Sequence, residues 1–595
     1  MKKIVSFLFL IVTLHTFAQK EANIWYFGEN AGLDFNSGTP QPLTNGQLNT
    51  FEGCSSFSDN NGNLLFYSDG TTVWNRNHTI MLNGTGLKGD PSSTQSAMIV
   101  PKPGSTFEFY LFTVGARVSG GEFGFNYYTI DMSTEGGLGS VVAGPIDLSE
   151  GRFSNWTEKV AAIKGKECNT FWVLSYVENE FYAYKISSAG VAANPVKSSG
   201  YYFTNDRRGY LKISPNGKKV AIAHMGDAKF YLYDFNTGTG KVTNERLLPL
   251  VAPADKPYGA EFSANSKKLY VNASNDFFSN VSSEWNNPSN HFSTLYQFDI
   301  SSENINDINN SRIIIDSQNL FRGGLQLGPD QKIYRALSKT YNIGMPTLGV
   351  IENPENDGLA CNYNHKAISL GGNNSTQGLP PFIASIFSQI EIKNVDINGS
   401  TSILNDQTSN LCVGDNFNVI PETLTGLTTY TWYFNGSSTP YSTIANLTFT
   451  NLATVNNGIY SLVVTQTDIC GNVSTLEGEF SLKVHSVPIA NQPSSISECD
   501  TDNDGYLTFN LKNLKDTEVL NGQSATEYEV SYFRNQTDAD ANINAITSPY
   551  TNSSALVRIL LLHVFIIFKT LYAMKLKVLL FKYLKPQIHL QQFQV

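Results

Sequence analysis

Three copies of one short motif decide the fold of this chain: LKISPNGKKV at residues 211–220, AEFSANSKKLYV at 260–271 and LQLGPDQKIYR at 325–335. Each copy places a turn between two short strands in which apolar residues alternate with polar ones. In the first copy Pro215 fixes φ, while Asn216 and Gly217 tolerate the left-handed conformation that such a turn requires. Repeats of this kind, spaced by roughly 45 to 65 residues, are typical of β-propeller blades.

The region 19–387 divides into about seven blade-like units. Four precede the motif copies and begin near Ile24, Cys54, Ser96 and Trp156. A four-stranded blade cannot bury both of its faces alone, so we expect the units to close into a ring. Large aromatic residues stand at strand positions where they would fill the space between blades: Trp25, Tyr67, Trp74, Phe112, Trp172, Tyr184, Tyr233 and Tyr270.

Composition agrees with an all-β class. The 595 residues are 12% aromatic and only 15% charged, and the length suggests two to four domains. The net charge of −10, with no basic cluster before the carboxyl-terminal tail, excludes nucleic acid and anionic membrane surfaces as partners.

Both ends of the chain have unusual composition. Residues 1–18 carry two lysines, an apolar run and a Thr-Phe-Ala ending, which predicts a secretory signal peptide. Residues 551–595 contain no Gly, Asp or Glu, and charged or polar side chains interrupt every apolar stretch that could span a membrane. We interpret 555–595 as the product of a shifted reading frame; the alternative is a basic amphipathic membrane segment.

Residues 411–485 follow a predicted linker at 388–410 and resemble an immunoglobulin-like β-sandwich. Trp432 and Tyr460 match the core Trp and the corner Tyr of that pattern. Leu462 stands where the second Cys is expected, and Cys470 follows shortly after it. The resemblance therefore implies a disulfide between Cys412 and Cys470, displaced from the usual position.

A third unit, 486–554, reads as an incomplete acidic β repeat. Asp500, Asp502 and Asp504 have the spacing of a calcium loop, but position twelve is Leu511 and not the expected Glu. The sequence leaves open a calcium site or an acidic Asx-rich turn.

Six cysteines in an exported chain indicate local cross-links. Three of them, Cys54, Cys168 and Cys361, fall within the propeller, so at least one is unpaired or pairs elsewhere. Buried structural thiols are the favoured interpretation, and the sequence leaves the pairing of these three and of Cys499 open.

No motif predicts catalysis. The propeller has four histidines, none at zinc-ligand spacing, and no G-x-S-x-G turn. The segments 156–159 (WTEK) and 206–208 (DRR) are the nearest to a charged cluster, and they read equally well as solvated loops or as an ion pair between blades. Because loops of a propeller converge on its axis, a site assembled from several blades stays open.

Several segments carry a resemblance to a known family. NIWYFGENAGLDFNSG from Asn23, FEGCSSFSDNNGNLLFYSDGTTVWNRNH from Phe51, WTEKVAAI and LKISPNGKKVAIA are similar to the amino-terminal propeller of large Bacteroidota surface proteins, which the type IX secretion system exports and which are often described as gliding-motility-associated. The later sandwich and ECDTDNDGYLTFNL segments resemble the repeats that follow in such proteins. The resemblance covers 19–549. No segment matches the sorting domain of that group.

These observations lead to one expected function and two alternatives. We expect a secreted or cell-surface, non-enzymatic adhesion protein, with the propeller as binding head and the sandwich repeats as stalk; without a sorting domain, the expected location is the periplasm. Its partners would be a surface glycan or protein and the export machinery, with no cofactor apart from the calcium considered above. The alternatives are a propeller enzyme acting on polysaccharide, as lyase or glycosidase, and an architectural component of a surface layer.

Overall fold

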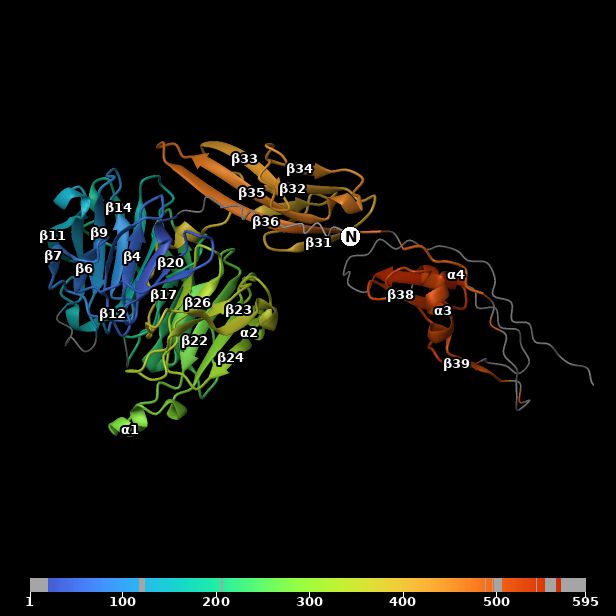
Figure 1. Ribbon diagram of the computed structural model, residues 1–595, viewed down its shortest axis with the longest axis horizontal. Coiled ribbons are helices and arrows are strands. Elements are labelled where there is room, and N and C mark those ends of the chain that lie inside the picture. Colours follow the sequence, from blue (N-terminus) through green and yellow to red (C-terminus); the bar gives the residue numbers. More distant parts are fainter. Residues whose placement is uncertain are drawn as a thin grey trace, which may run out of the picture. The chain divides into compact units, whose positions relative to one another are not determined.

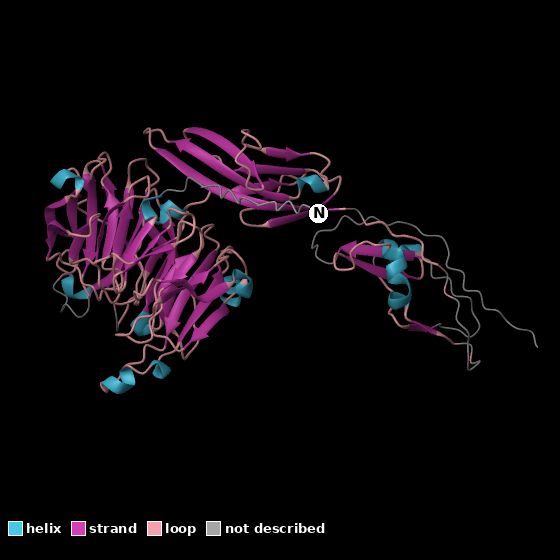
Figure 2. Cartoon of the chain, viewed as in Figure 1, coloured by secondary structure: helices cyan, strands magenta, loops and turns pink. Residues whose placement is uncertain are grey.

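The computed structural model describes residues 20–116, 123–204, 207–486, 488–494, 496, 504, 506–541, 543–551 and 563–568. The predicted signal peptide lies outside this set, as do Asp206, Cys499, Asp500, Asp502 and most of the tail. The chain forms two compact units. The first comprises Met1–Gln407, Asn418–Leu447 and Ile459–Phe480, and the second comprises Thr408–Phe417, Thr448–Gly458 and Ser481–Val595. Strands dominate, as the all-β prediction requires (Figures 1 and 2).

Seven blades occupy the amino-terminal part, which confirms the β-propeller prediction. Blade 1 has three strands, blade 4 has five and the others have four. Blades 2 and 3 are antiparallel meanders joined at one parallel pair, Leu82 with Ser140. The strands of blades 1 to 3 are β1 (Ile24–Phe27), β2 (Ala31–Asp34), β3 (Gln41–Leu43), β4 (Ser55–Ser58), β5 (Leu64–Ser68), β6 (Thr72–Asn75), β7 (Ile80–Thr85), β8 (Ala97–Pro101), β9 (Glu108–Val114), β10 (Phe125–Asp131) and β11 (Ser140–Asp147).

The remaining four blades contain the motif copies. Their strands are β12 (Trp156–Lys164), β13 (Phe171–Val177), β14 (Glu180–Ser187), β15 (Gly190–Val191), β16 (Val196–Ser199), β17 (Leu211–Ile213), β18 (Lys219–His224), β19 (Lys229–Asn236), β20 (Lys241–Leu247), β21 (Lys256–Phe262), β22 (Lys268–Ser274), β23 (Ser293–Asp299), β24 (Ile313–Gln318), β25 (Leu325–Leu327), β26 (Ile333–Arg335), β27 (Thr347–Ile351) and β28 (Tyr363–Ser369). Two short helices lie in loops of blade 6, α1 (Ser282–Trp285) and α2 (Ile305–Asn310).

The motif turns share one conformation. Gly217, Ser266 and Gln331 occupy the same position in the three copies, and all three have a left-handed backbone, with φ of 69°, 62° and 63°. Their amides donate to the carbonyls of Ser214, Ser263 and Gly328. The sequence therefore predicted the turn correctly, although only the first copy uses the glycine that this backbone favours.

Side-chain packing closes the ring. The first strands of neighbouring blades contact one another from β4 through β25, so they form the innermost layer. Successive hydrophobic clusters join each blade to the next, and one of them joins blade 7 to blade 1 through Tyr334 and Trp25, whose rings lie 5.4 Å apart. Seven of the eight aromatic residues predicted between blades are buried, and Trp74 is half-buried.

The immunoglobulin-like region begins earlier than predicted. Residues 388–410, expected to be a linker, contribute β29 (Ile392–Val395), β30 (Thr401–Ile403) and the start of β31 (Thr408–Cys412). The prediction was wrong because these strands are short and polar on their exposed faces, and pairing with other strands is what defines them. The other strands are β32 (Phe417–Pro421), β33 (Leu427–Phe434), β34 (Leu447–Phe449), β35 (Gly458–Thr467) and β36 (Val473–His485).

Two four-stranded sheets make up this region, in the orders β30-β29-β32-β34 and β31-β36-β35-β33. Trp432 is fully buried, as predicted for the core Trp, and its Nε1 donates to the Ala445 carbonyl (3.0 Å). Tyr460 is buried as well and stacks on Phe480, with ring centroids 5.2 Å apart.

The last region is not purely β, in contrast to the prediction of an acidic β repeat. It contains α3 (Leu511–Leu520), β37 (Thr508–Phe509), β38 (Tyr528–Phe533), α4 (Gln536–Ala541), β39 (Tyr550–Thr551) and β40 (His563–Phe568). Leu511, which stands at the ligand position of the expected calcium loop, is a fully buried core residue of α3. Strand β40 falls within the predicted frameshifted tail and pairs with β38.

Within the described residues, no helix has both the length and the apolar character needed to cross a membrane.

Candidate functional site

The axis of the propeller is filled by its own chain. After β28 the chain turns inward, and residues 375–383 are completely buried. At the mouth where the innermost strands begin, here called the entry mouth, Gln377 accepts from the Gly324 amide (2.6 Å) and donates its amide to the Phe51 carbonyl (3.0 Å). At the opposite mouth the Ser388 hydroxyl donates to the Pro215 carbonyl (2.6 Å). Residues 376–388, the axial segment, therefore run from one mouth to the other.

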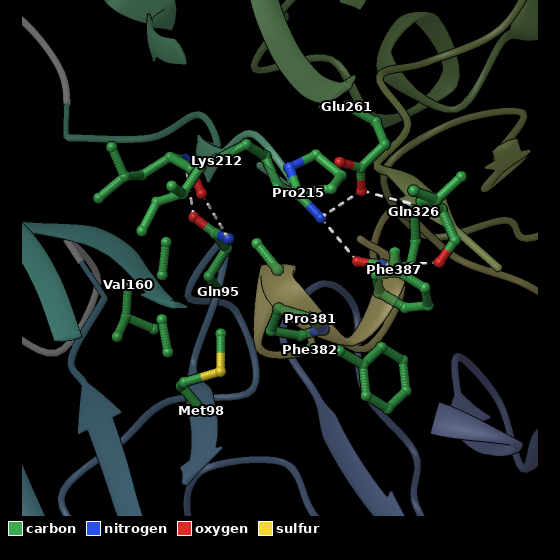
Figure 3. Close-up of a pocket in the computed structure, with 16 residues that line it drawn as sticks. Gln95, Met98, Val160, Lys212, Pro215, Glu261, Gln326, Pro381, Phe382 and Phe387 are labelled. Atoms are coloured by element: carbon green, nitrogen blue, oxygen red, sulfur yellow. Dashed lines mark hydrogen bonds and ion pairs between the residues drawn. The ribbon is translucent and has the colours of Figure 1, made fainter. Parts of the chain in front are cut away.

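A hydrogen-bonded triad lines the axis beside this segment (Figure 3). Lys212 Nζ lies 2.7 Å from Glu261 Oε2 and 2.6 Å from Gln326 Oε1. These three residues hold the second position of the three motif copies, and all are at least nine-tenths buried. The cavity next to them is about 20 Å³, room for one water-sized molecule. The axis is consequently a packed core and not a ligand channel.

A second charged group closes the entry mouth. Arg322 Nη2 lies 2.6 Å from Glu52 Oε1, and these side chains are 2% and 1% exposed. The other Glu52 oxygen accepts from the Tyr258 hydroxyl (2.8 Å), while Arg322 Nε donates to Gln377 Oε1 (2.7 Å). The guanidinium also lies 4.9 Å from the ring centre of Tyr258. Such an ion pair requires these additional partners, because burial removes the hydration of both charges.

The structure brings together the two charged segments that the sequence singled out. Lys159 is fully buried, and its Nζ donates to the carbonyls of Arg207 (2.6 Å) and Arg208 (2.9 Å). Glu158 is also buried and accepts from the amide and hydroxyl of Thr94. Of the two interpretations left open, contact between blades is correct for Glu158 and Lys159. Asp206 lies outside the described residues.

An exposed row of aromatic rings lies on the same mouth, and we call it the aromatic strip: Phe51, Tyr341, Trp285 and Phe278. Phe51 stacks on Tyr341 and Tyr341 on Trp285, with centroid distances of 5.1 and 5.3 Å. Phe278 meets Trp285 edge-on at 5.3 Å. Phe51 is 42% exposed and Phe278 is 65% exposed. Three loops from different blades supply these rings, so no local sequence pattern could have revealed the strip.

The propeller histidines are uncharged at neutral pH. Burial lowers the pKa of His78, His224, His291 and His365 below the ordinary value of 6.5. His224 is fully buried against Tyr176, Tyr201 and other rings, and His291 Nε2 donates to the Trp285 carbonyl (2.6 Å). These contacts are structural.

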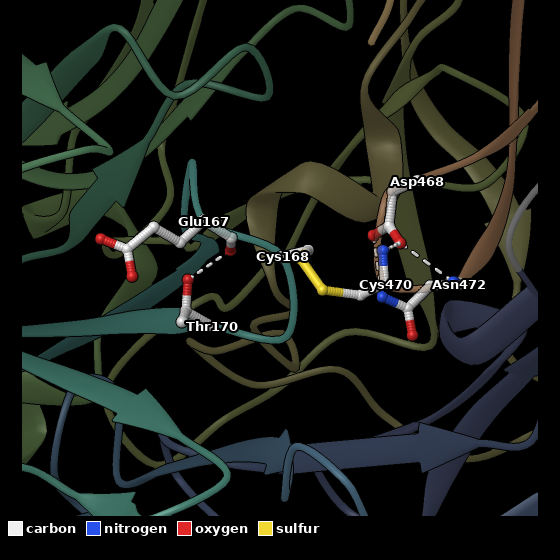
Figure 4. Close-up of a disulfide and its surroundings, with 6 residues drawn as sticks. All are labelled: Glu167, Cys168, Thr170, Asp468, Cys470 and Asn472. Carbon is white, nitrogen blue, oxygen red and sulfur yellow. Dashed lines mark hydrogen bonds between the residues drawn. A yellow bond between two sulfur atoms is a disulfide. The ribbon is translucent and has the colours of Figure 1, made fainter. Parts of the chain in front are cut away.

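The predicted Cys412–Cys470 disulfide is wrong. Cys470 bonds to Cys168, with Cα atoms 6.1 Å apart and 302 residues between them, and Cys412 is a free thiol (Figure 4). Cys412 pairs in register with His485 at one end of β36, whereas Cys470 precedes Val473 at the other end. A strand of this length separates them by roughly 40 Å, far beyond the reach of a disulfide.

The cysteine count was nevertheless informative. The odd number in the propeller predicted a partner outside it, and Cys168, in the loop between β12 and β13, has one. Cys54 and Cys361 are buried free thiols, as expected, and burial raises the pKa of both. Of the predicted calcium ligands, Asp504 is described, whereas Asp500 and Asp502 are not, so this site stays a prediction.

Comparison with known proteins gives one family match. A model described as the Flavobacterium inter-domain disulphide bond domain matches residues 495–563, a range that contains Cys499 and extends into the predicted tail. No curated protein matches this chain. The family match fits the resemblance to Bacteroidota surface proteins.

Several solved structures show low similarity. The extracellular domain of a protein described as a one-component system from B. thetaiotaomicron is 12% identical, with 78% of this chain and 56% of that chain covered, at a TM-score of 0.30. The extracellular domain of a hybrid two-component system from the same species is also 12% identical, with 79% and 55% covered, at 0.29. Kuenenia stuttgartiensis hydrazine synthase is 9% identical, with 67% and 99% covered, at 0.31. This chain thus spans just over half the length of the first two, and none of these similarities bears on its ligand.

Proposed function

We propose that this chain is an extracellular, non-enzymatic binding protein of a Bacteroidota cell surface, in which the propeller is the binding head and the sandwich is part of a stalk. The observation that carries the proposal is the contrast at the entry mouth: the axis is packed, while the aromatic strip is open to solvent. A disulfide that closes a loop of 302 residues fits an oxidising compartment outside the cytoplasm. Export by the type IX system and a part in gliding motility follow from the family resemblance.

The buried acids of the entry mouth favour binding over catalysis. A glycosidase or lyase needs a carboxylate, or a His with Tyr or Arg, that reaches the substrate. Glu52 is held by Arg322 and Tyr258, and Glu158 by Thr94, and both glutamates are 1% exposed. These groups stabilise the ring and do not face an open pocket.

The test is a binding screen with the oxidised full chain on arrays of glycans and surface proteins. We expect a saturable ligand and no change in its covalent structure. Cleavage of a polysaccharide would favour the enzyme alternative. The absence of any ligand, together with a surface-layer defect in a deletion strain, would favour the architectural one.

A further inference from the structure

The aromatic strip depends on an insertion that packing of the propeller does not explain. In blade 5 the second and third strands are joined by the short turn Met225–Asp227 and Ala228. In blade 6 the corresponding connection is residues 275–292 and carries α1, Phe277, Phe278 and Trp285. An insertion that holds apolar rings in solvent is a mark of a binding surface.

The insertion is held rigidly. The Asn275 amide group donates to the Asn290 carbonyl (2.9 Å), and the Asn290 amide group donates to the Glu284 carbonyl (2.8 Å). The Ser279 hydroxyl donates to Glu284 Oε2 (2.7 Å). These bonds fix Phe278 and Trp285 before any ligand arrives, so little conformational entropy is lost on binding.

Polar groups without charge border the rings. The Ser92 hydroxyl lies 3.0 Å from the Tyr341 hydroxyl, and Asn342 donates to Asn286 Oδ1 (3.2 Å). A pyranose has an apolar face of C–H bonds and a rim of hydroxyls, and it meets both features at once: its face stacks on a ring, and its rim bonds amides and hydroxyls. A protein partner would need about 800 Å² of contact on each side, which a row one ring wide does not supply alone.

The cations near the strip already have anionic partners. Arg322 pairs with Glu52 at 2.6 Å, and Arg208 pairs with Asp276 at 3.3 Å. An acidic sugar would have to displace these carboxylates. The chemistry of the strip therefore favours a sugar without charge.

We propose that the aromatic strip binds a neutral polysaccharide by stacking pyranose rings on Phe278 and its neighbours. This inference rests on the proposed function and names the ligand class and the site. Phe51 and Phe278 are the most exposed rings and lie at the two ends of the row, so successive sugars of one chain would contact them.

The experiment measures retardation of the oxidised full chain in native gels that contain laminarin, xyloglucan, galactomannan or dextran. The variants are Phe278→Ala and Trp285→Ala. The matched control is Phe107→Ala, because Phe107 is 56% exposed but lies between β8 and β9, at the opposite end of its blade. We expect at least one neutral polysaccharide to bind, and each strip variant to weaken it about tenfold, equal to about 1.4 kcal/mol, with no effect of the control.

Two results would overturn the site. One is equal binding by the wild type and by Phe278→Ala, whose exposed side chain can be removed without unfolding the ring. The other is binding only to alginate, pectin or a protein in the array screen; the proposed function would then stand and the strip would not be its site. If no neutral polysaccharide binds, the inference fails.

Discussion

The axis and the entry face of the propeller lie next to each other and solve opposite problems. On the axis, Arg322 and Glu52 are almost completely buried and bonded to each other and to further partners. On the face, Phe278 is 65% exposed, although burial would favour an apolar ring. Charges inside and rings outside reverse the usual distribution. The comparison teaches that the axis holds the ring together, while the face is available for binding.

The largest effect is expected from breaking the axial ion pair. Arg322→Leu leaves Glu52 buried without its cation, and we expect a loss of about 3–5 kcal/mol in the free energy of unfolding. Chemical denaturation measures it. As a control, Lys102→Met removes an ion pair with Glu108 in which both side chains are more than a quarter exposed, and it should cost at most about 1 kcal/mol. Equal losses in the two variants would show that the axis is not special.

Removal of the disulfide tests whether the axial segment needs a covalent partner downstream. Cys168→Ser should lower the free energy of unfolding by about 2–4 kcal/mol, because the unfolded chain gains the freedom that the closed loop denies it. Scanning calorimetry with and without reductant measures the change. Cys412→Ser is the control, since this thiol is free, and reductant should affect it as it affects the wild type.

A single methyl group tests the fit of the axial segment. A Cβ on Gly378 would lie 1.7 Å from the Glu52 carbonyl oxygen, so Gly378→Ala must displace the segment or the loop. We expect a loss of about 1–3 kcal/mol. Gly238→Ala, where the nearest atom is 3.2 Å away, should be better tolerated. If both variants melt at the same temperature, the axis is more loosely packed than described.

The pH dependence of stability extends the comparison to a buried carboxyl group outside the axis. Burial, with the Asp406 charge as a second cause, raises the pKa of Glu355 from 4.5 to about 8. The folded chain keeps this proton at pH values where the unfolded chain has lost it, so stability decreases as the pH rises between these values. Glu355→Gln should flatten this decrease by about 1 kcal/mol between pH 5 and 8. A parallel pH profile in the variant would contradict the prediction.

The smallest effect is expected on the face. Phe278→Ala removes an exposed ring and should change the free energy of unfolding by less than about 0.5 kcal/mol. Measured beside Arg322→Leu in the same denaturant series, it gives the stability difference between face and axis directly. A loss as large as that of the axial variant would mean that the insertion supports the ring.

Local sequence signals predicted much of the propeller, and the reason is physical. A turn with a left-handed residue and strands with alternating apolar residues depend on neighbours in the chain, as the shared backbone of Gly217, Ser266 and Gln331 shows. The signals failed where pairing is distant: residues 388–410 became strands only through pairing with others, and Cys470 found Cys168 and not Cys412.

The sequence by itself determined the repeated blade, its turns, the all-β class and the odd cysteine in the propeller. Tertiary structure alone decided that Lys212, Glu261 and Gln326 meet on the axis, that residues 376–388 fill it, and that four rings from separate loops form a row. Periodicity is a property of neighbours in the chain, whereas these contacts arise only when a ring of seven blades closes and brings distant loops to the same mouth.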